Sequence, residues 1–507
     1  MRATSTVQAN ELTKVALLLP DGVGARNFLI GSFPAAARGR LSVSVVSRIP
    51  ESFRRIYEEQ LGQPIDWHAL NLYPDTLALY MFRNLVSYGH MYSIDTFGMR
   101  CKRELPITGA AVPRLKAEFA RMLGRVVARL AGMQGVARLD RYFAGMVARL
   151  PETQHYRQIF ERTRPDVVLS SNQRPYGVAP AVLAAQSLGI PTATCIFSWD
   201  NLSRKGRIAA SFDHYLVWSD LMRTELQQFY PEIRPEQIHL VGAMQFDPHA
   251  DAGLLRPRAE FFRKIGADPS RPLLCYSAGD QAGCPEDQDH LELLLNLVRR
   301  GQIAGNPQVV LRPTPTGIGK RFDGVRQRHP ELIYSQPEWA CAEGGDWTQV
   351  LPLPGDPALL ANLAHHCDVN ISVASTITLD FSLHSRPVVN IAFDVANPPP
   401  FKYPLWDFCY RFEHYRPIVQ QGAALFARSS EELARHVNTY LANPGLHEEN
   451  RRRILDLQIG APVGTASQRI VDLLIDLAKR QVSAANRVNQ RLRSEFDSSI
   501  GTLQSTR

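Results

Sequence analysis

The chain has 507 residues, of which 45% are hydrophobic and 21% are charged, and its formal net charge is +8. These proportions suit a globular protein and exclude a mainly disordered, collagenous or coiled-coil chain. No apolar run approaches the roughly 18 residues that span a bilayer, and the start lacks a signal-peptide core, so we predict a cytoplasmic protein. The seven cysteines form no CxxC pair, which predicts reduced thiols.

The positive charge is concentrated in one stretch. Between Arg114 and Arg149, eight Lys and Arg residues face only Glu118 and Asp140, a net charge of +6 (eight minus two). Such a stretch attracts anionic lipid or an anionic acceptor. No nucleic-acid motif accompanies it, so we expect no nucleic-acid partner. A plain solvated helix pair is the alternative.

The first part of the chain opens with apolar, β-branched runs that predict strands at 15–19 and 41–47. Residues 51–150 are predicted to be mainly helical. Within them, large apolar residues recur at offsets of three and four and form one stripe with arginines opposite: Leu115, Phe119, Met122, Leu123, Val126, Val127 and Leu130. This spacing predicts an amphipathic helix.

Strands and helices then alternate on both sides of a polar segment, 246–257, which is the predicted linker. Before it we expect strands at 165–171, 192–199, 214–219 and 238–243, with helices at 178–188 and from 220. After it we expect strands at 271–280, 307–315, 351–353, 367–375 and 386–393. Helices are expected at 289–300, 358–366, 376–384, 430–442 and 466–481, a loop at 397–407, and a polar tail at 482–507.

This alternation predicts an α/β protein with two doubly wound, Rossmann-like lobes. We place the first lobe at 1–250, with the helical insert 51–150 inside it, and the second lobe at 258–465. Doubly wound sheets bind ligands at the carboxyl ends of their strands, so a substrate cleft is expected between the lobes.

The segment 367–394 carries the most chemical information. Its strand is predicted to end at Ser375 and Thr376, where a helix begins, and free N–H groups at a helix start can hold phosphate. Asp380 lies one turn further on and could accept hydrogen bonds from a ribose. The string "HHCDVNISVASTITLDFSLHSRPVVNIAFD" resembles the donor-nucleotide segment of GT-B fold glycosyltransferases, including envelope-polysaccharide members and the related CDP-glycerol glycerophosphotransferases. The family more often has Glu where this chain has Asp380.

Other segments are similar to the same family. "VVLRPTP" matches a strand that often ends in RPHP, with Thr314 in place of the His, and it offers Arg312 to the donor diphosphate. "CYSAGD" resembles the first strand and loop of the donor lobe, which implies donor contacts from Ser277, Gly279 and Asp280. The helix 466–481 is similar to the one that crosses back to the first lobe.

The first lobe supplies the implied acceptor side. "SWDNLSRKG" resembles a loop of envelope-polysaccharide members and offers an apolar ring, an amide, a hydroxyl and a cation: Trp199, Asn201, Ser203 and Lys205. "LLPDGVGARNFL" resembles the first Gly-rich loop, where Gly22 and Gly24 let the backbone approach a ligand. For the base of an inverting transfer we consider Asp200 and then Asp21; a retaining enzyme needs none.

The resemblance implies a transferase that moves a sugar from a nucleotide-sugar donor to a glycan or lipid-linked acceptor in the bacterial envelope. It implies no cofactor and no metal. The basic stretch 114–149 would then meet an anionic membrane surface. Three alternatives stay open: a CDP-polyol glycerophosphotransferase, a nucleotide-sugar epimerase or hydrolase, and a non-catalytic nucleotide-sugar-binding partner.

Overall fold

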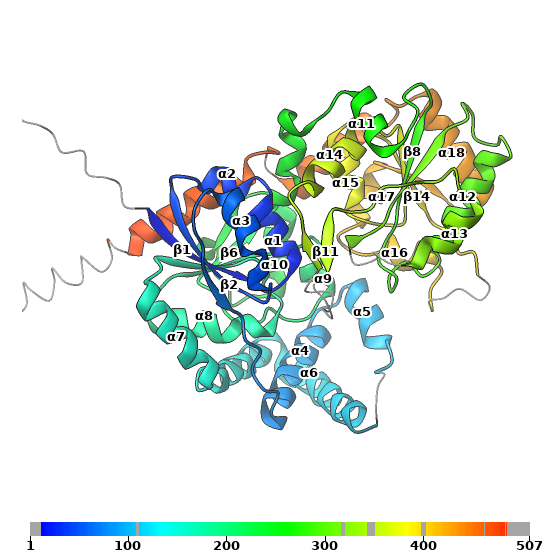
Figure 1. Ribbon diagram of the computed structural model, residues 1–507. Coiled ribbons are helices and arrows are strands. Elements are labelled where there is room, and N and C mark those ends of the chain that lie inside the picture. Colours follow the sequence, from blue (N-terminus) through cyan, green and yellow to red (C-terminus); the bar gives the residue numbers. More distant parts are fainter. Residues whose placement is uncertain are drawn as a thin grey trace, which may run out of the picture.

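The computed structural model describes residues 12–107, 111–315, 320–341, 350–396, 402–460, 462–481 and 483. It contains two α/β lobes, each built on a parallel sheet with helices on its faces (Figure 1). The predicted α/β class with two doubly wound lobes is therefore confirmed. The predicted tail 482–507, apart from residue 483, and part of the predicted loop 397–407 lie outside the described residues.

The first lobe has a seven-stranded sheet in the order β3-β2-β1-β4-β5-β6-β7. Its strands are β1 Thr13–Leu19, β2 Leu41–Ser47, β3 Asp66–Ala69, β4 Val167–Ser170, β5 Thr192–Cys195, β6 His214–Val217 and β7 Ile238–Leu240. The central strands are buried on both faces, which explains why they read as near-continuous apolar runs. β3, a half-exposed edge strand, was not predicted because it lacks such a run.

Helices and short turns connect these strands. They are α1 Gly22–Ala25, the π-helix η1 Arg26–Ile30, α2 Phe33–Ala37, η2 Glu51–Phe53, α3 Arg54–Leu61, α7 Pro151–Thr163, η3 Tyr176–Val178, α8 Ala179–Ser187, α9 Asn201–Arg204, α10 Asp220–Phe229 and η4 Pro235–Gln237. The segment 20–24, predicted as a loop, already contains α1, because the Asp21 side chain caps a helix that starts at Gly22.

The second lobe has a six-stranded sheet in the order β10-β9-β8-β13-β14-β15 and a separate antiparallel pair, β11 and β12. Its strands are β8 Leu273–Ser277, β9 Gln308–Arg312, β10 Ile333–Tyr334, β11 Trp339–Cys341, β12 Val350–Pro352, β13 Val369–Ser372, β14 Val388–Ile391 and β15 Leu425–Ala427. The strand predicted at 351–353 is thus β12, and it belongs to the pair and not to the main sheet.

The helices of the second lobe cover both faces of its sheet (Figure 1). They are α11 Arg258–Ile265, α12 Asp287–Arg299, η8 Lys320–Phe322, α13 Asp323–Arg328, α14 Asp356–His366, α15 Ile377–Leu383, α16 Leu405–Cys409, α17 Arg416–Gln421, α18 Ser430–Ala442 and α19 Glu448–Ile459. A last helix, 466–481, returns to the first lobe and packs apolar residues such as Ile470 and Leu474 into the core beneath β1.

The segment between the lobes is more ordered than the predicted polar linker. It forms two 3₁₀ helices, η5 Met244–Ala250 and η6 Ala252–Leu254. Phe246, Asp247 and His249 are buried in it. The Asp247 carboxylate accepts hydrogen bonds from the backbone N–H groups of Gly464 and Ser467 at 3.1 and 2.7 Å, so the linker anchors the start of the returning helix.

The insert is helical as predicted and consists of α4 Leu77–Ser93, α5 Phe97–Glu104 and α6 Ala111–Val147. Within α6 the backbone leaves helical geometry at Gly132 (φ 55°, ψ −156°). Small residues face α4: a Cβ at Gly124 would lie 2.6 Å from the Cβ of Tyr88. None of the helices in the described part of the chain has the length and apolar character needed to cross a bilayer.

Candidate functional site

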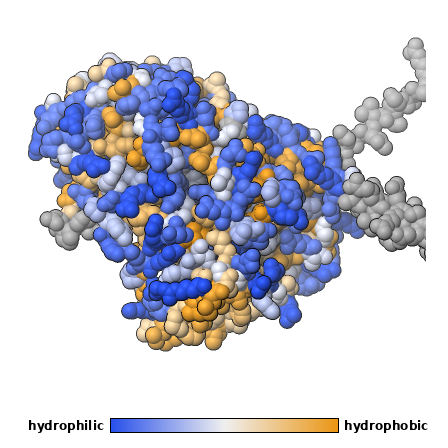
Figure 2. All heavy atoms as spheres, turned by 180° about the vertical axis from the view of Figure 1, so that it is seen from behind, coloured by the Kyte–Doolittle hydropathy of each residue, from blue (hydrophilic) through white to orange (hydrophobic). Residues whose placement is uncertain are grey.

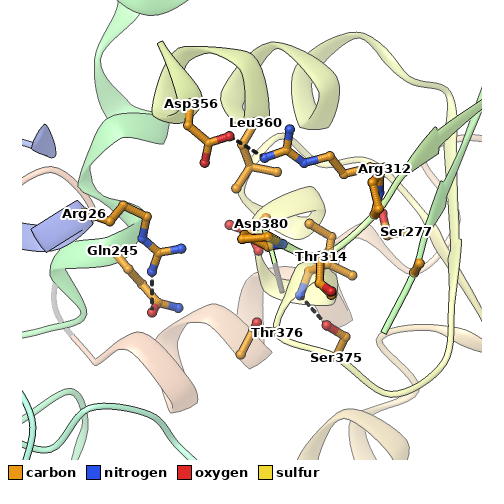
Figure 3. A pocket seen from close by; sticks show the side chains of 14 residues that line it. Arg26, Gln245, Ser277, Arg312, Thr314, Asp356, Leu360, Ser375, Thr376 and Asp380 are labelled. Atoms are coloured by element: carbon orange, nitrogen blue, oxygen red, sulfur yellow. Dashed lines mark hydrogen bonds and ion pairs between the residues drawn. The ribbon is translucent and has the colours of Figure 1, made fainter. Parts of the chain in front are cut away.

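A cavity of about 180 Å³ lies where the two lobes meet (Figure 3). Most of its walls come from the carboxyl ends of β8, β9 and β13, where doubly wound sheets present ligand-binding groups. Five residues predicted for the donor line it together: Ser277, Arg312, Ser375, Thr376 and Asp380. Side chains that the sequence analysis did not select complete it, among them Arg26, Gln245, Asp356 and Leu360.

Arg312 is held by a buried ion pair. Its Nη2 lies 2.7 Å from Oδ1 of Asp356, and both side chains are less than a tenth exposed. The same carboxylate accepts hydrogen bonds from the Trp339 indole at 2.7 Å and the Glu338 backbone N–H at 3.0 Å. The Nη1 of Arg312 is buried without an acceptor among the described residues. The guanidinium is thus fixed in place with one donor group unused.

Arg26 approaches the same cavity from the first lobe (Figure 3). Its guanidinium donates to the side chains of Asn27 at 3.2 Å and Gln245 at 3.3 Å and forms no ion pair with a described carboxylate. Burial lowers the pKa of Arg26, and the Asp356 and Asp380 carboxylates oppose that shift. A desolvated guanidinium without an ion-pair partner is suited to an anionic ligand.

Asp380 is connected to the linker. Its Oδ1 lies 2.9 Å from Nε2 of His249, whose Nδ1 lies 3.0 Å from Nε2 of His384. Burial, reinforced by the neighbouring His249, lowers the pKa of His384 to about 3. His384 is therefore neutral at physiological pH, and the chain of contacts orients the Asp380 carboxylate.

The hydroxyl groups of the cavity are only partly available. Ser277 donates to Oδ1 of Asn370 at 2.6 Å. Ser375 accepts from the backbone N–H of Ile377 at 3.4 Å, and Thr376 occupies the N-cap position of α15 without a capping hydrogen bond. Because α15 has only seven residues, the guanidinium groups carry more of the positive field than the helix does.

Two predicted donor residues do not line the cavity. The backbone N–H of Gly279 donates to Oδ2 of Asp287 at 2.7 Å, and a Cβ at Gly279 would lie 2.3 Å from Sγ of Cys284. Asp280 is exposed and accepts from the N–H of Gly283 at 2.8 Å. The structure therefore gives both residues a role in the turn before α12.

The Gly-rich segment packs against protein. A Cβ at Gly22 would lie 1.9 Å from the carbonyl oxygen of Val350 in β12, and one at Gly24 would lie 2.3 Å from Oγ of Ser171. Asp21 is buried; its Oδ1 accepts from Gly24 N–H and its Oδ2 from the Asn172 amide, both at 2.9 Å. The glycines allow the lobes to approach each other, and Asp21 caps α1.

The residues of the SWDNLSRKG loop lie together at the lobe interface but away from the cavity lining. Trp199, Asn201 and Ser203 are buried, and the Trp199 ring lies 5.3 Å from the ring of His414 in the second lobe. Nζ of Lys205 lies 3.2 Å from Oδ2 of Asp200.

Electrostatics argue against Asp200 as a base. Burial raises the pKa of Asp200, but the Lys205 cation, with weaker help from other neighbours, brings it to about 2. Such a carboxylate is a weak proton acceptor at neutral pH. The structure thus separates the two predicted bases, Asp200 and Asp21, from the donor cavity.

Three lining residues were missed by the sequence analysis. Arg26 follows the Gly-rich segment directly, Gln245 lies at the start of the linker, and Asp356 belongs to the Gly-Asp-Pro turn at the start of α14. Each lies where chain segments enter the cleft, but no local pattern tells that Arg26 crosses to the other lobe.

Comparisons with known proteins agree with this architecture. No family model matches the chain. A lipid-A-disaccharide synthase from Geobacter sulfurreducens is 22% identical over 259 residues, which are 47% of this chain and 58% of that protein. The chain thus matches less than two thirds of the length of this relative.

Among solved structures, UDP-GlcNAc 2-epimerase from Neisseria meningitidis, bound to UDP-GlcNAc, superposes with a TM-score of 0.50 at 10% identity and covers 92% of this chain and 100% of its own. A glycosyltransferase from Rickettsia africae gives a TM-score of 0.46 at 10% identity, with 92% and 99% covered. The first likeness, together with the two parallel sheets, establishes a two-lobed fold of the GT-B type.

Proposed function

We propose that this chain is a glycosyltransferase that moves a sugar from a nucleotide-sugar donor to a glycan or lipid-linked acceptor in bacterial envelope polysaccharide synthesis. The partial relationship to a lipid-A-disaccharide synthase supports glycosyl transfer. The observation that carries the proposal is the cavity between the lobes, which two guanidinium groups line from opposite sides.

The two guanidiniums fit a nucleoside diphosphate leaving group. Arg312 is fixed by Asp356 and keeps one unused donor, and Arg26 adds a second positive charge from the other lobe. In a dry cavity such preorganised cations stabilise the negative charge that grows on the diphosphate as the glycosidic bond to the sugar breaks. Asp380, oriented by His249, is placed to accept hydrogen bonds from the ribose.

The first experiment is titration calorimetry with UDP, GDP, CDP, CMP and ADP in the absence of metal. We expect one nucleoside diphosphate to bind. Arg26→Gln should weaken its binding about 10- to 100-fold, because a charge-assisted hydrogen bond to phosphate is lost. Arg435→Gln, which removes the same charge from the exposed surface of α18, is the matched control and should bind as wild type. Absence of binding by all five nucleotides would contradict the proposal.

Arg26 is a better test residue than Arg312. Removing Arg312 would leave the buried Asp356 carboxylate without its cation, and loss of binding could then reflect a damaged cavity. Ser375→Ala is a milder second variant, since Ser375 accepts only a long hydrogen bond from Ile377. Metal independence is part of the proposal: EDTA should leave nucleotide binding unchanged.

The epimerase reading is the second candidate, favoured by the fold likeness to UDP-GlcNAc 2-epimerase. It differs from a transferase in needing no acceptor. Incubation with UDP-GlcNAc alone, followed by NMR of the sugar, separates the two: a 2-epimerised product supports the epimerase, and an unchanged donor supports the transferase. Selective binding of CDP would instead favour a glycerophosphotransferase, and binding without turnover in any assay would favour a non-catalytic partner.

A further inference from the structure

The large apolar stripe of the insert points into solvent. Figure 2 shows a hydrophobic area at the lower edge of the molecule, where the insert projects. On α6 it contains five large side chains that are 45 to 83% exposed: Leu115, Phe119, Met122, Val126 and Leu130. They recur at offsets of four, three, four and four, and therefore form one continuous face of the helix.

The face that α6 buries is made of small residues. Ala117, Ala120 and Gly124 are buried, and Gly124 lies so close to α4 that a Cβ would overlap Tyr88. An ordinary surface helix buries its large apolar side and exposes its polar side. Here the large side is left over, and an exposed apolar patch of this kind marks an interaction surface.

The charges beside the stripe identify its partner. With about 100° of rotation per residue, Arg125 and Arg129 flank the stripe and do not oppose it, which corrects the arrangement predicted from the sequence. Both are exposed, and the stretch 114–149 carries a net charge of +6. Large apolar side chains bordered by arginines are the signature of a helix that lies in the interface of an anionic membrane.

We propose that this stripe inserts into the surface of an anionic lipid bilayer, with Arg125 and Arg129 at the level of the lipid phosphates. The biological meaning of the contact rests on the proposed function, because a lipid-linked acceptor would be presented at that surface.

The insert also reaches the cleft between the lobes. The backbone N–H of Phe97, at the start of α5, donates to the Glu413 carboxylate of the second lobe at 2.6 Å. Near the end of α5, Glu104 accepts from Nζ of Lys402 at 2.6 Å and from the Tyr403 hydroxyl at 2.9 Å. A bilayer bound to α6 would therefore lie beside the edge of the cleft at which an acceptor enters.

The test is cosedimentation with vesicles of phosphatidylcholine alone and of phosphatidylcholine with about 30% phosphatidylglycerol. Wild type should bind the anionic vesicles at least tenfold more strongly. The double variant Phe119→Gln/Leu130→Gln should lower that partition at least tenfold, since two inserted side chains are lost. The matched control is Leu457→Gln, an exposed leucine on α19 of the second lobe, and it should stay within about twofold of wild type.

The charge contribution is tested separately. Arg125→Gln/Arg129→Gln should reduce the preference for phosphatidylglycerol and flatten the dependence on salt, because fewer cations meet lipid phosphates. All four changed positions are solvent-exposed, so circular dichroism and thermal denaturation should match wild type.

Other outcomes would overturn the inference. Equal, weak binding of wild type to both vesicles would remove the membrane as partner. A wild-type dimer that the Phe119→Gln/Leu130→Gln variant converts to a monomer would assign the stripe to a second copy of the chain. Nucleotide binding, measured without vesicles on the same variants, keeps the two proposals apart: it should be unchanged, and its absence in wild type would defeat the transferase proposal alone.

Discussion

Arg312 and Asp356 show how a residue selected for binding can also be structural. The sequence predicted Arg312 as a diphosphate ligand, because it ends a strand at the expected edge of the sheet. Its partner Asp356 was not predicted, since the ion pair joins residues 44 positions apart. The pair makes the guanidinium a fixed wall of the cavity.

Arg312→Ala should therefore destabilise the protein as well as weaken binding. We expect the free energy of unfolding to fall by about 3–5 kcal/mol, because the buried Asp356 carboxylate loses its counter-charge. Arg312→Lys keeps a cation and should cost clearly less. Chemical denaturation followed by circular dichroism measures both; equal stability of Arg312→Ala and wild type would contradict this account of the pair.

Glu225 provides a prediction for pH. It lies on α10, where burial, followed by the Glu413 and Asp200 charges, raises its pKa from 4.5 to about 8. A carboxyl group with a higher pKa in the folded chain binds more protons when folded, so its contribution to stability is lost as the pH rises from about 4.5 through about 8.

Glu225→Gln should remove that loss. Relative to wild type it should gain about 2–4 kcal/mol of stability between pH 5 and pH 9, taking roughly 1.4 kcal/mol per pKa unit as the upper scale. Denaturation midpoints across this range measure the difference. Glu236→Gln, at an exposed carboxyl of the same lobe, is the control and should follow the wild-type curve.

At the scale of elements, sequence patterns predicted the sheet strands that are long and buried, and failed where the fold depends on distant contacts. The pair β11 and β12 is the clearest case: three residues per strand give too little pattern, and their antiparallel pairing breaks the alternation around them. The stripe on α6 is the opposite case. Its periodicity was evident, but only the small residues packed on α4 reveal that it faces outward.

The β11–β12 pair also explains the Gly-rich segment. The start of α1 lies against β12, and a side chain at position 22 would overlap the Val350 carbonyl oxygen at 1.9 Å. Gly22→Ala should therefore push the pair away and cost about 1–3 kcal/mol, as overpacking does. Gly145→Ala, on α6 with no atom within 4 Å of the added Cβ, should be neutral or slightly stabilising. Thermal denaturation of the two variants gives the comparison, and equal midpoints would show that the contact yields easily.

At the scale of the whole molecule, the sequence predicted two lobes and a cleft from the repeated alternation alone. It could not predict how the cleft is assembled, since this depends on the buried linker. His249 in η5 meets Asp380, and Asp247 holds the start of the last helix. The same segment therefore contacts the donor cavity and the helix that joins the second lobe to the first.

Because Arg26 and Arg312 belong to different lobes, a bound nucleoside diphosphate should link them. Ligand at about 100 times its Kd should stabilise the protein by about 2.7 kcal/mol, and hydrogen exchange should slow both in 22–30 of the first lobe and in 370–383 of the second. In Arg26→Gln, at equal occupancy, protection should remain in 370–383 and disappear in 22–30. Protection of 370–383 alone in wild type would mean that the ligand binds to the second lobe only, and that Arg26 lies near the cavity without holding the phosphates.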